Sequence, residues 1–140
     1  MAGLRTLARP LLASIFVVQG LQSAQDPDRV VPLAEPVVKQ LSGLVPALPG
    51  ETEQAVRVNG AVQAAAGATL GIGLLPRLSA LVLAATLVPT TLAGHRFWEY
   101  ENAQERAQQR IHFLKNLTVL GGLLIAVADN GGRRKPAAKK

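Results

Sequence analysis

The sequence predicts an all-α integral membrane protein, a bundle of four transmembrane helices with a long first outer loop. Three observations lead to this prediction. Apolar residues make up 49% of the 140 residues and charged residues only 17%, against roughly 25% charged residues in ordinary soluble domains. Four stretches are free of charge and are separated by polar segments. A soluble protein of this length would leave too much apolar surface exposed to water.

The four uncharged stretches are residues 10–25, 58–76, 78–95 and 116–128. A spanning helix needs about 20 predominantly apolar residues. The first stretch reaches this length if Arg5 and Arg9 extend to the headgroups, and the last if residues 111–115 form its opening turn. We therefore expect spans at about 6–23, 57–75, 78–95 and 111–128 in one membrane domain, residues 1–128. Residues 129–140 form a basic tail.

The first stretch has an alternative interpretation as a cleaved signal peptide, because Arg5 and Arg9 precede an apolar run. The run ends in Leu21-Gln22-Ser23-Ala24-Gln25, which lacks a clean small-x-small cleavage pattern. We therefore favour a retained helix.

The connection between the first two spans, residues 25–55, contains apolar residues at helical spacing, and Pro46 ends any helix there. This pattern predicts a short amphipathic helix that lies on the membrane or caps the bundle. Pro76-Arg77 leaves room only for a tight hairpin between the second and third spans. Pro89 predicts a kink or break before Thr90-Thr91. The apolar residues of the first connection are Val37, Val38, Leu41, Leu44, Val45 and Leu48.

Lysine and arginine counts near the span ends indicate orientation. With the N-terminus inside, the cytoplasmic side carries eight basic residues and the outer side seven. The first outer loop also holds most of the acidic residues. We expect both termini in the cytoplasm, in the plasma membrane. The cytoplasmic set is Arg5, Arg9, Arg77, Arg133, Arg134, Lys135, Lys139 and Lys140, and the outer set is Arg29, Lys39, Arg57, Arg96, Arg106, Arg110 and Lys115.

Composition excludes several function classes. The chain has no cysteine, so disulfides, thiol catalysis, iron–sulfur clusters and four-helix disulfide-forming membrane enzymes are excluded. No acidic residue lies within a span, which argues against a four-span drug exporter. The basic tail follows an apolar segment and is typical of contact with anionic membrane lipid. It lacks the stacking aromatics or motif of a nucleic-acid-binding protein.

Polar residues converge at the outer ends of the four spans, and polar groups in hydrocarbon usually face the bundle interior or a cavity. On the second span, Asn59, Gln63, Gly67 and Gly71 share one stripe, in which the glycines permit close helix approach. No catalytic residue stands out. The candidate site, for a quinone or as a polar cluster, comprises Arg57, Asn59, Gln63, His95, Trp98, His112, Lys115 and Asn116.

The two histidines allow other interpretations. A haem held by His95 and His112 would need both rings to face each other across the core, but these residues flank a loop near the surface, so haem is disfavoured. A metal site would need more ligands than the histidines and nearby glutamates clearly supply. The alternative is an interfacial polar network anchored by Trp98 and Tyr100, which suit the headgroup zone.

Several segments resemble the DoxX family, in a form similar to actinobacterial members. They are Arg9-Pro10-Leu11-Leu12-Ala13-Ser14-Ile15-Phe16, Asn59-Gly60-Ala61-Val62-Gln63, Leu75-Pro76-Arg77, Pro89-Thr90-Thr91, His95-Arg96-Phe97-Trp98, and Gln109-Arg110-Ile111-His112-Phe113-Leu114-Lys115-Asn116-Leu117. Arg96 replaces the proline, aspartate or asparagine that is frequent in relatives. The resemblance implies a four-helix plasma-membrane protein. It also implies similarity to the small subunit of an archaeal thiosulfate:quinone oxidoreductase and to members linked with redox-stress defence.

These observations lead to two functional hypotheses. The first is a quinone-linked redox subunit of a membrane oxidoreductase complex, which binds a quinone headgroup at the outer end of the bundle and relies on redox protein partners. The alternative is a non-catalytic membrane scaffold that recruits redox or cell-envelope proteins. Whether the chain is itself an enzyme is left open by the sequence.

Overall fold

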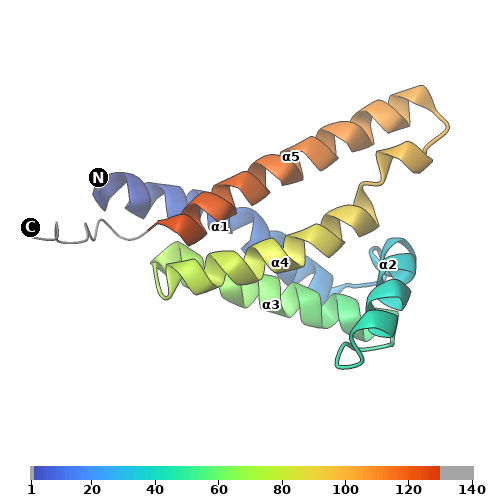
Figure 1. The fold of residues 1–140 in the computed structure, drawn as a ribbon, viewed down its shortest axis with the longest axis horizontal. Helices are drawn as coiled ribbons and strands as arrows, with labels where there is room; N and C mark the ends of the chain where they lie inside the picture. Colours follow the sequence, from blue (N-terminus) through green and yellow to red (C-terminus); the bar gives the residue numbers. More distant parts are fainter. Residues whose placement is uncertain (1, 130–140) are drawn as a thin grey trace, which may run out of the picture.

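The computed structural model describes residues 2–129, which fold into five α-helices and one short 3-10 turn (Figure 1). No strand occurs in this part of the chain, so the predicted all-α class is confirmed. The helix bounds are α1 (Ala2–Gln25), α2 (Val31–Leu44), α3 (Thr52–Ile72), α4 (Pro76–Gly94), η1 (Phe97–Glu99) and α5 (Ala103–Ala128). Residues 130–140, which include most of the predicted basic tail, lie outside the described residues.

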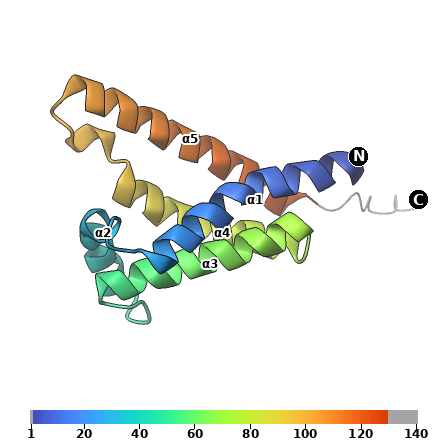
Figure 2. The same cartoon turned by 180° about the vertical axis from the view of Figure 1, so that it is seen from behind.

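Within the described residues, three helical segments are long and apolar enough to cross a membrane: Gly3–Gln25, Pro76–Glu99 and Ala103–Ala128. Helix α3 has spanning length, at 21 residues, but Arg57, Asn59 and Gln63 make it less apolar. It runs antiparallel beside α1 (Figure 2), and its crossing of the membrane stays a prediction. Asn59 and Gln63 face α4, where polar and small residues are tolerated, whereas Arg57 is exposed near the start of the helix.

Glycines bring α1 and α3 into backbone contact. A Cβ atom added to Gly60 would lie 2.6 Å from the Gly20 carbonyl oxygen, and one added to Gly20 would lie 2.6 Å from the Gly60 oxygen. A Cβ atom added to Gly67 would lie 3.0 Å from Val17 Cγ2 and 3.2 Å from Phe16 Cβ. Lipid tails are as apolar as leucine, so association of these helices depends on close packing. The predicted role of Gly67 in helix packing is confirmed.

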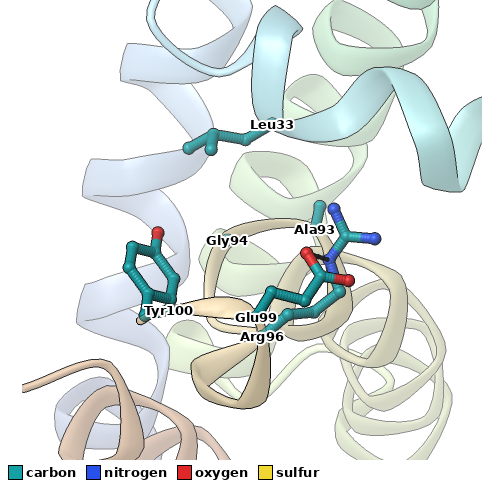
Figure 3. Close-up of a pocket in the computed structure, with 6 residues that line it drawn as sticks. All are labelled: Leu33, Ala93, Gly94, Arg96, Glu99 and Tyr100. Atoms are coloured by element: carbon teal, nitrogen blue, oxygen red, sulfur yellow. Dashed lines mark ion pairs between the residues drawn. The ribbon is translucent and has the colours of Figure 1, made fainter. Parts of the chain in front are cut away.

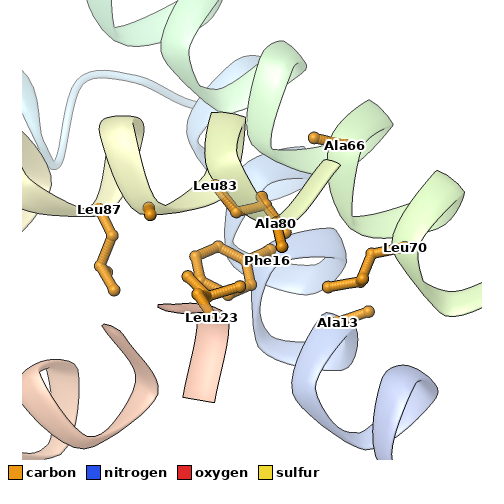
Figure 4. Close-up of a cluster of buried hydrophobic side chains, with 9 residues drawn as sticks. Ala13, Phe16, Ala66, Leu70, Ala80, Leu83, Leu87 and Leu123 are labelled. Atoms are coloured by element: carbon orange, nitrogen blue, oxygen red, sulfur yellow. The ribbon is translucent and has the colours of Figure 1, made fainter. Parts of the chain in front are cut away.

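One apolar core joins the four long helices (Figure 4). Each helix contributes buried side chains, and Leu70, Leu83 and Leu123 are fully enclosed. Leu123 is the only buried residue of α5, because this helix leaves the others along most of its length (Figure 1). The core consists of Ala13 and Phe16 from α1, Ala66 and Leu70 from α3, Ala80, Leu83, Ala84 and Leu87 from α4, and Leu123 from α5.

Helix α2 packs on the start of α3 and the end of α4, so it caps one end of the bundle. Its Ala34 and Val37 form a second buried cluster with Val56 of α3 and Ala93 of α4. The helix ends at Leu44, two residues before Pro46. The predicted amphipathic helix is therefore present. Its apolar residues from Ala34 to Leu41 pack against protein, whereas Leu44 is exposed.

The first and last described residues lie at the opposite side of the bundle from α2. The Arg5 guanidinium pairs with the Asp129 carboxylate at 2.9 Å, and Arg77 Nε donates to the Val127 carbonyl oxygen at 2.8 Å. The predicted tight hairpin lies at this same end, where Gly73 and Leu75 adopt positive φ angles of 79° and 46°. Both ends of the described chain therefore lie on one side, and the cytoplasmic assignment of that side stays a prediction.

Two local expectations need correction. Helix α4 continues through Pro89 to Gly94, so the predicted break is absent, and the kink stays a prediction. Thr90 and Thr91 each donate a hydroxyl hydrogen bond to a carbonyl four residues earlier, in the turns around the proline. Helix α5 begins at Ala103, well before the predicted span at 111. The Asn102 side chain accepts hydrogen bonds from the amides of Gln104 and Glu105, which caps the helix there.

Candidate functional site

Thr90 of α4 accepts hydrogen bonds from two of the predicted site residues. Asn59 Nδ2 and Gln63 Nε2 of α3 both donate to the Thr90 hydroxyl oxygen at 3.2 Å. Gln63 is 5% exposed, so its amide depends on this partner because lipid offers none. These two residues therefore lie inside the bundle and connect α3 to α4.

The adjacent Thr91 connects α4 to α5. Asn116 Nδ2 donates to the Thr91 hydroxyl oxygen at 3.0 Å, and Thr91 is buried. The neighbouring threonines thus direct their hydroxyls to two different helices. Asn59, Gln63 and Asn116 therefore form one interior polar belt with Thr90 and Thr91, in which each amide nitrogen donates to a threonine hydroxyl.

The two histidines meet above this belt. The imidazole rings of His95 and His112 stack with centroids 5.2 Å apart and planes 19° from parallel. His95 Nδ1 lies 2.8 Å from Gln109 Oε1. Beside them, Phe97, Trp98 and Phe113 form an edge-to-face aromatic cluster with centroid separations of 5.2–5.9 Å. This cluster fastens the turn between α4 and α5 onto α5. Within residues 2–129, no group of three or more His, Asp or Glu residues is placed to hold a metal ion.

The two cations of the predicted site lie elsewhere. Arg57 pairs with Glu53 at 2.9 Å and donates to the Ala24 carbonyl oxygen at 2.9 Å. It therefore satisfies the end of α1, whose last carbonyls have no partner within their own helix. Lys115 is exposed on α5, although its neighbour Asn116 points into the bundle. The eight predicted residues therefore do not form a single site.

The structure contains a groove that the sequence analysis did not predict. It has a volume of about 340 Å³ and lies between α2 and α4, at the end of the bundle opposite the α3–α4 hairpin. Its walls are apolar, and its polar groups are Gln40, Arg96 and Trp98. The full lining is Val37, Gln40, Leu41, Leu44, Val88, Pro89, Leu92, Arg96 and Trp98. Of the predicted site residues, Trp98 alone lines it.

Arg96 also borders a second, smaller cavity of about 200 Å³ (Figure 3). There its Nε lies 3.3 Å from the Glu99 carboxylate. This Nε is buried and makes no hydrogen bond of good geometry within the described chain. Tyr100 and Leu33 complete the cavity wall. Arg96 therefore lines both the apolar groove and this smaller cavity of mixed polarity.

This geometry is suited to a flat amphiphilic ligand. Small-molecule sites are mostly apolar pockets with a few placed polar groups. The groove supplies apolar walls, an indole ring, and a guanidinium and an amide that can donate to an oxygen atom. The site predicted from the sequence includes Trp98 but not Arg96 or Gln40, which also line the groove. An arginine directly before Phe97-Trp98 was the available signal; nothing local marks Gln40, because only the docking of α2 on α4 brings it there.

Comparison with known proteins identifies the family. The DoxX family profile matches residues 4–96. The chain belongs to the DoxX family. The match runs from the start of α1 to Arg96 and so includes α1 to α4 and the threonines of the polar belt. The part of this DoxX protein that follows Arg96, including α5, lies beyond it. No curated protein and no solved structure matches the chain.

Proposed function

We propose that this DoxX-family protein is the membrane subunit of a quinone-linked redox system and binds a quinone headgroup in the groove between α2 and α4. The observation that carries the proposal is the groove itself: an apolar slot at the outer end of a membrane bundle, with Arg96, Gln40 and Trp98 at its polar positions. A quinone is a flat apolar ring with two carbonyl oxygens, which need donors. The resemblance to the small subunit of a thiosulfate:quinone oxidoreductase supports the same ligand class.

Each element of the groove has a role in this proposal. Leu41 and Leu44 of α2 and Leu92 of α4 would cover the ring and the first part of an isoprenoid tail. The Arg96 guanidinium would donate to one carbonyl oxygen. Partner proteins would supply or remove the electrons.

The proposal is tested by fluorescence titration of the purified protein with a short-chain menaquinone. Trp98 is the only tryptophan of the chain and lines the groove, so a bound quinone would quench it directly. We expect saturable quenching. Arg96→Gln should weaken binding by about tenfold to a hundredfold, the loss of one charged hydrogen bond.

Two controls make the titration specific. Arg29→Gln removes an exposed arginine of the same outer side, and it should bind as the parent does. An isoprenoid alcohol of equal length, which lacks the ring, should not saturate. Linear quenching that is the same in parent and Arg96→Gln would reject the groove as a quinone site. A scaffold, the competing function, needs the bundle but not an occupied groove.

A further inference from the structure

Helices α1 and α5 touch at one end and diverge toward the other (Figures 1 and 2). At the end that holds the termini, Arg5 pairs with Asp129 at 2.9 Å. Further along, a Cβ atom added to Gly122 would lie 3.4 Å from a Leu12 methyl. The two contacts are separated by seven residues on each helix, which is two turns. They set the register in which the two helices would continue to face each other.

At the next position in this register, α1 and α5 are not in contact. Seven residues after Leu12 comes Gln19, and seven before Gly122 comes Lys115. Both residues are exposed. Within the described chain, neither side chain makes a hydrogen bond or an ion pair. The Gln19 amide and the Lys115 ammonium group therefore lie at the same height, exposed on two helices that diverge.

With the Arg5–Asp129 ion pair at one edge of the hydrocarbon core, the height of Gln19 and Lys115 lies within the membrane. Gln19 and Lys115 are each 14 residues from the Arg5–Asp129 ion pair, which is about 21 Å along a helix. The hydrocarbon core is about 30 Å thick. A charged group at this depth is rare in membrane helices unless it pairs with another group or faces a cavity.

We infer that the open side of α1 and α5 docks a transmembrane helix of another protein, and that this helix carries a carboxyl group that pairs with Lys115. Charge complementarity identifies the partner. Residues 10–25, 58–94 and 106–128 contain no Asp or Glu, so a second copy of this chain has no carboxyl group to offer at this depth. Two copies that met through α5 would also bring two Lys115 ammonium groups together. Gln19 provides a second donor for the same carboxyl group.

This inference shares no residue with the quinone groove and does not depend on it. It is tested in vesicles of phosphatidylcholine and phosphatidylglycerol with a synthetic polyleucine transmembrane peptide. The peptide carries one Glu at 14 residues from its inner end, and an all-leucine peptide is the control. A donor dye on Gln108→Cys in the full chain and an acceptor on the peptide report association by energy transfer.

We expect the Glu peptide to associate about five to thirty times more strongly than the all-leucine peptide, the effect of one interhelical polar contact. Lys115→Leu should remove this preference, and Lys115→Arg should retain it. Lys39→Leu, a control on α2, should leave it unchanged. Lys115→Glu should instead prefer a peptide that carries Lys, a charge exchange that tests pairing even if Lys115→Leu folds poorly.

Equal association of the Glu and all-leucine peptides would overturn the inference and would show that Lys115 extends to the lipid headgroups instead. Energy transfer between two labelled copies of the chain, lost in Lys115→Leu and unaffected by peptide, would also overturn it in favour of self-association.

Discussion

At the residue scale, two glycines determine how closely α1 and α3 approach. Gly20 and Gly60 each lie against the other's carbonyl oxygen, so neither position has space for a methyl group. The obstacle is backbone rather than a flexible side chain, and only movement of a whole helix could relieve it. This contact therefore sets the distance between α1 and α3.

Gly60→Ala should lower the free energy of unfolding in detergent by about 1–3 kcal/mol, the usual effect of overpacking. Gly121→Ala is the matched control, because no atom lies within 4 Å of a Cβ added there. The control should equal or exceed the parent, since alanine favours a helix over glycine by about 0.5–1 kcal/mol. Denaturation followed by circular dichroism measures both. Equal stability of Gly60→Ala and the parent would show that α1 and α3 can separate freely.

Individual residues differ in how far sequence could predict their roles. The glycine stripe of α3 was predictable, because spacing alone places Gly67 and Gly71 on one face. Arg57 was misplaced, although Glu53 four residues earlier was a visible partner. Lys115 was grouped with Asn116, yet successive residues point in different directions on a helix, and the structure separates them.

At the element scale, α4 is the helix that the hydrogen bonds of the polar belt connect to both α3 and α5. Thr90 accepts from two α3 amides and Thr91 from one α5 amide. Both threonines also donate to carbonyls within α4, so each hydroxyl has its donor and acceptor roles filled. The polar belt thereby fixes the rotation of α3 and α5 about their axes relative to α4.

Thr90→Val should destabilise the protein by about 1–3 kcal/mol, because it leaves the buried Gln63 amide without an acceptor. The double variant Thr90→Val with Gln63→Leu should recover part of this loss, since the unsatisfied amide is then removed. Thr86→Val is the control, because the Thr86 hydroxyl bonds only to the Leu83 carbonyl of its own helix. Thermal unfolding in detergent measures all of these variants. A double variant no more stable than Thr90→Val would argue that Gln63 does not depend on Thr90.

The elements were largely predictable, and their packing was not. Apolar run lengths predicted four long helices and periodicity predicted α2. The early start of α5 was missed, although Asn102 followed three residues later by Glu105 is a capping pattern. The groove could not be predicted, because it forms where Val37 and Leu41 of α2 approach Val88 and Leu92 of α4. Residues about 50 positions apart in sequence carry no local signal of such contact.

At the scale of the whole molecule, the first and last described residues and the α3–α4 hairpin share one side, and α2 lies on the other. The predicted orientation can therefore be tested by finding on which side of the membrane α2 lies. We expect Gly43→Cys on α2 to react with a membrane-impermeant maleimide in intact cells. Leu74→Cys in the hairpin should react only after permeabilisation. The native chain has no cysteine, so each variant contains a single reactive thiol.

The reverse labelling pattern would place the termini outside. Reaction of both cysteines in intact cells would argue that the two sites are not separated by a bilayer. Either result would leave the groove, the polar belt and the glycine contact unchanged, because these depend on helix packing and not on orientation.

The ion pair between Arg5 and Asp129 also has a consequence for biosynthesis. A ribosome makes Arg5 among the first residues and Asp129 more than a hundred residues later, so the two cannot meet until nearly the whole chain has left the tunnel. The glycine contact between α1 and α3 can form as soon as α3 has been inserted. We therefore expect the bundle to assemble in order: α1 packs on α3 first, and α5 packs last, when Asp129 can pair with Arg5.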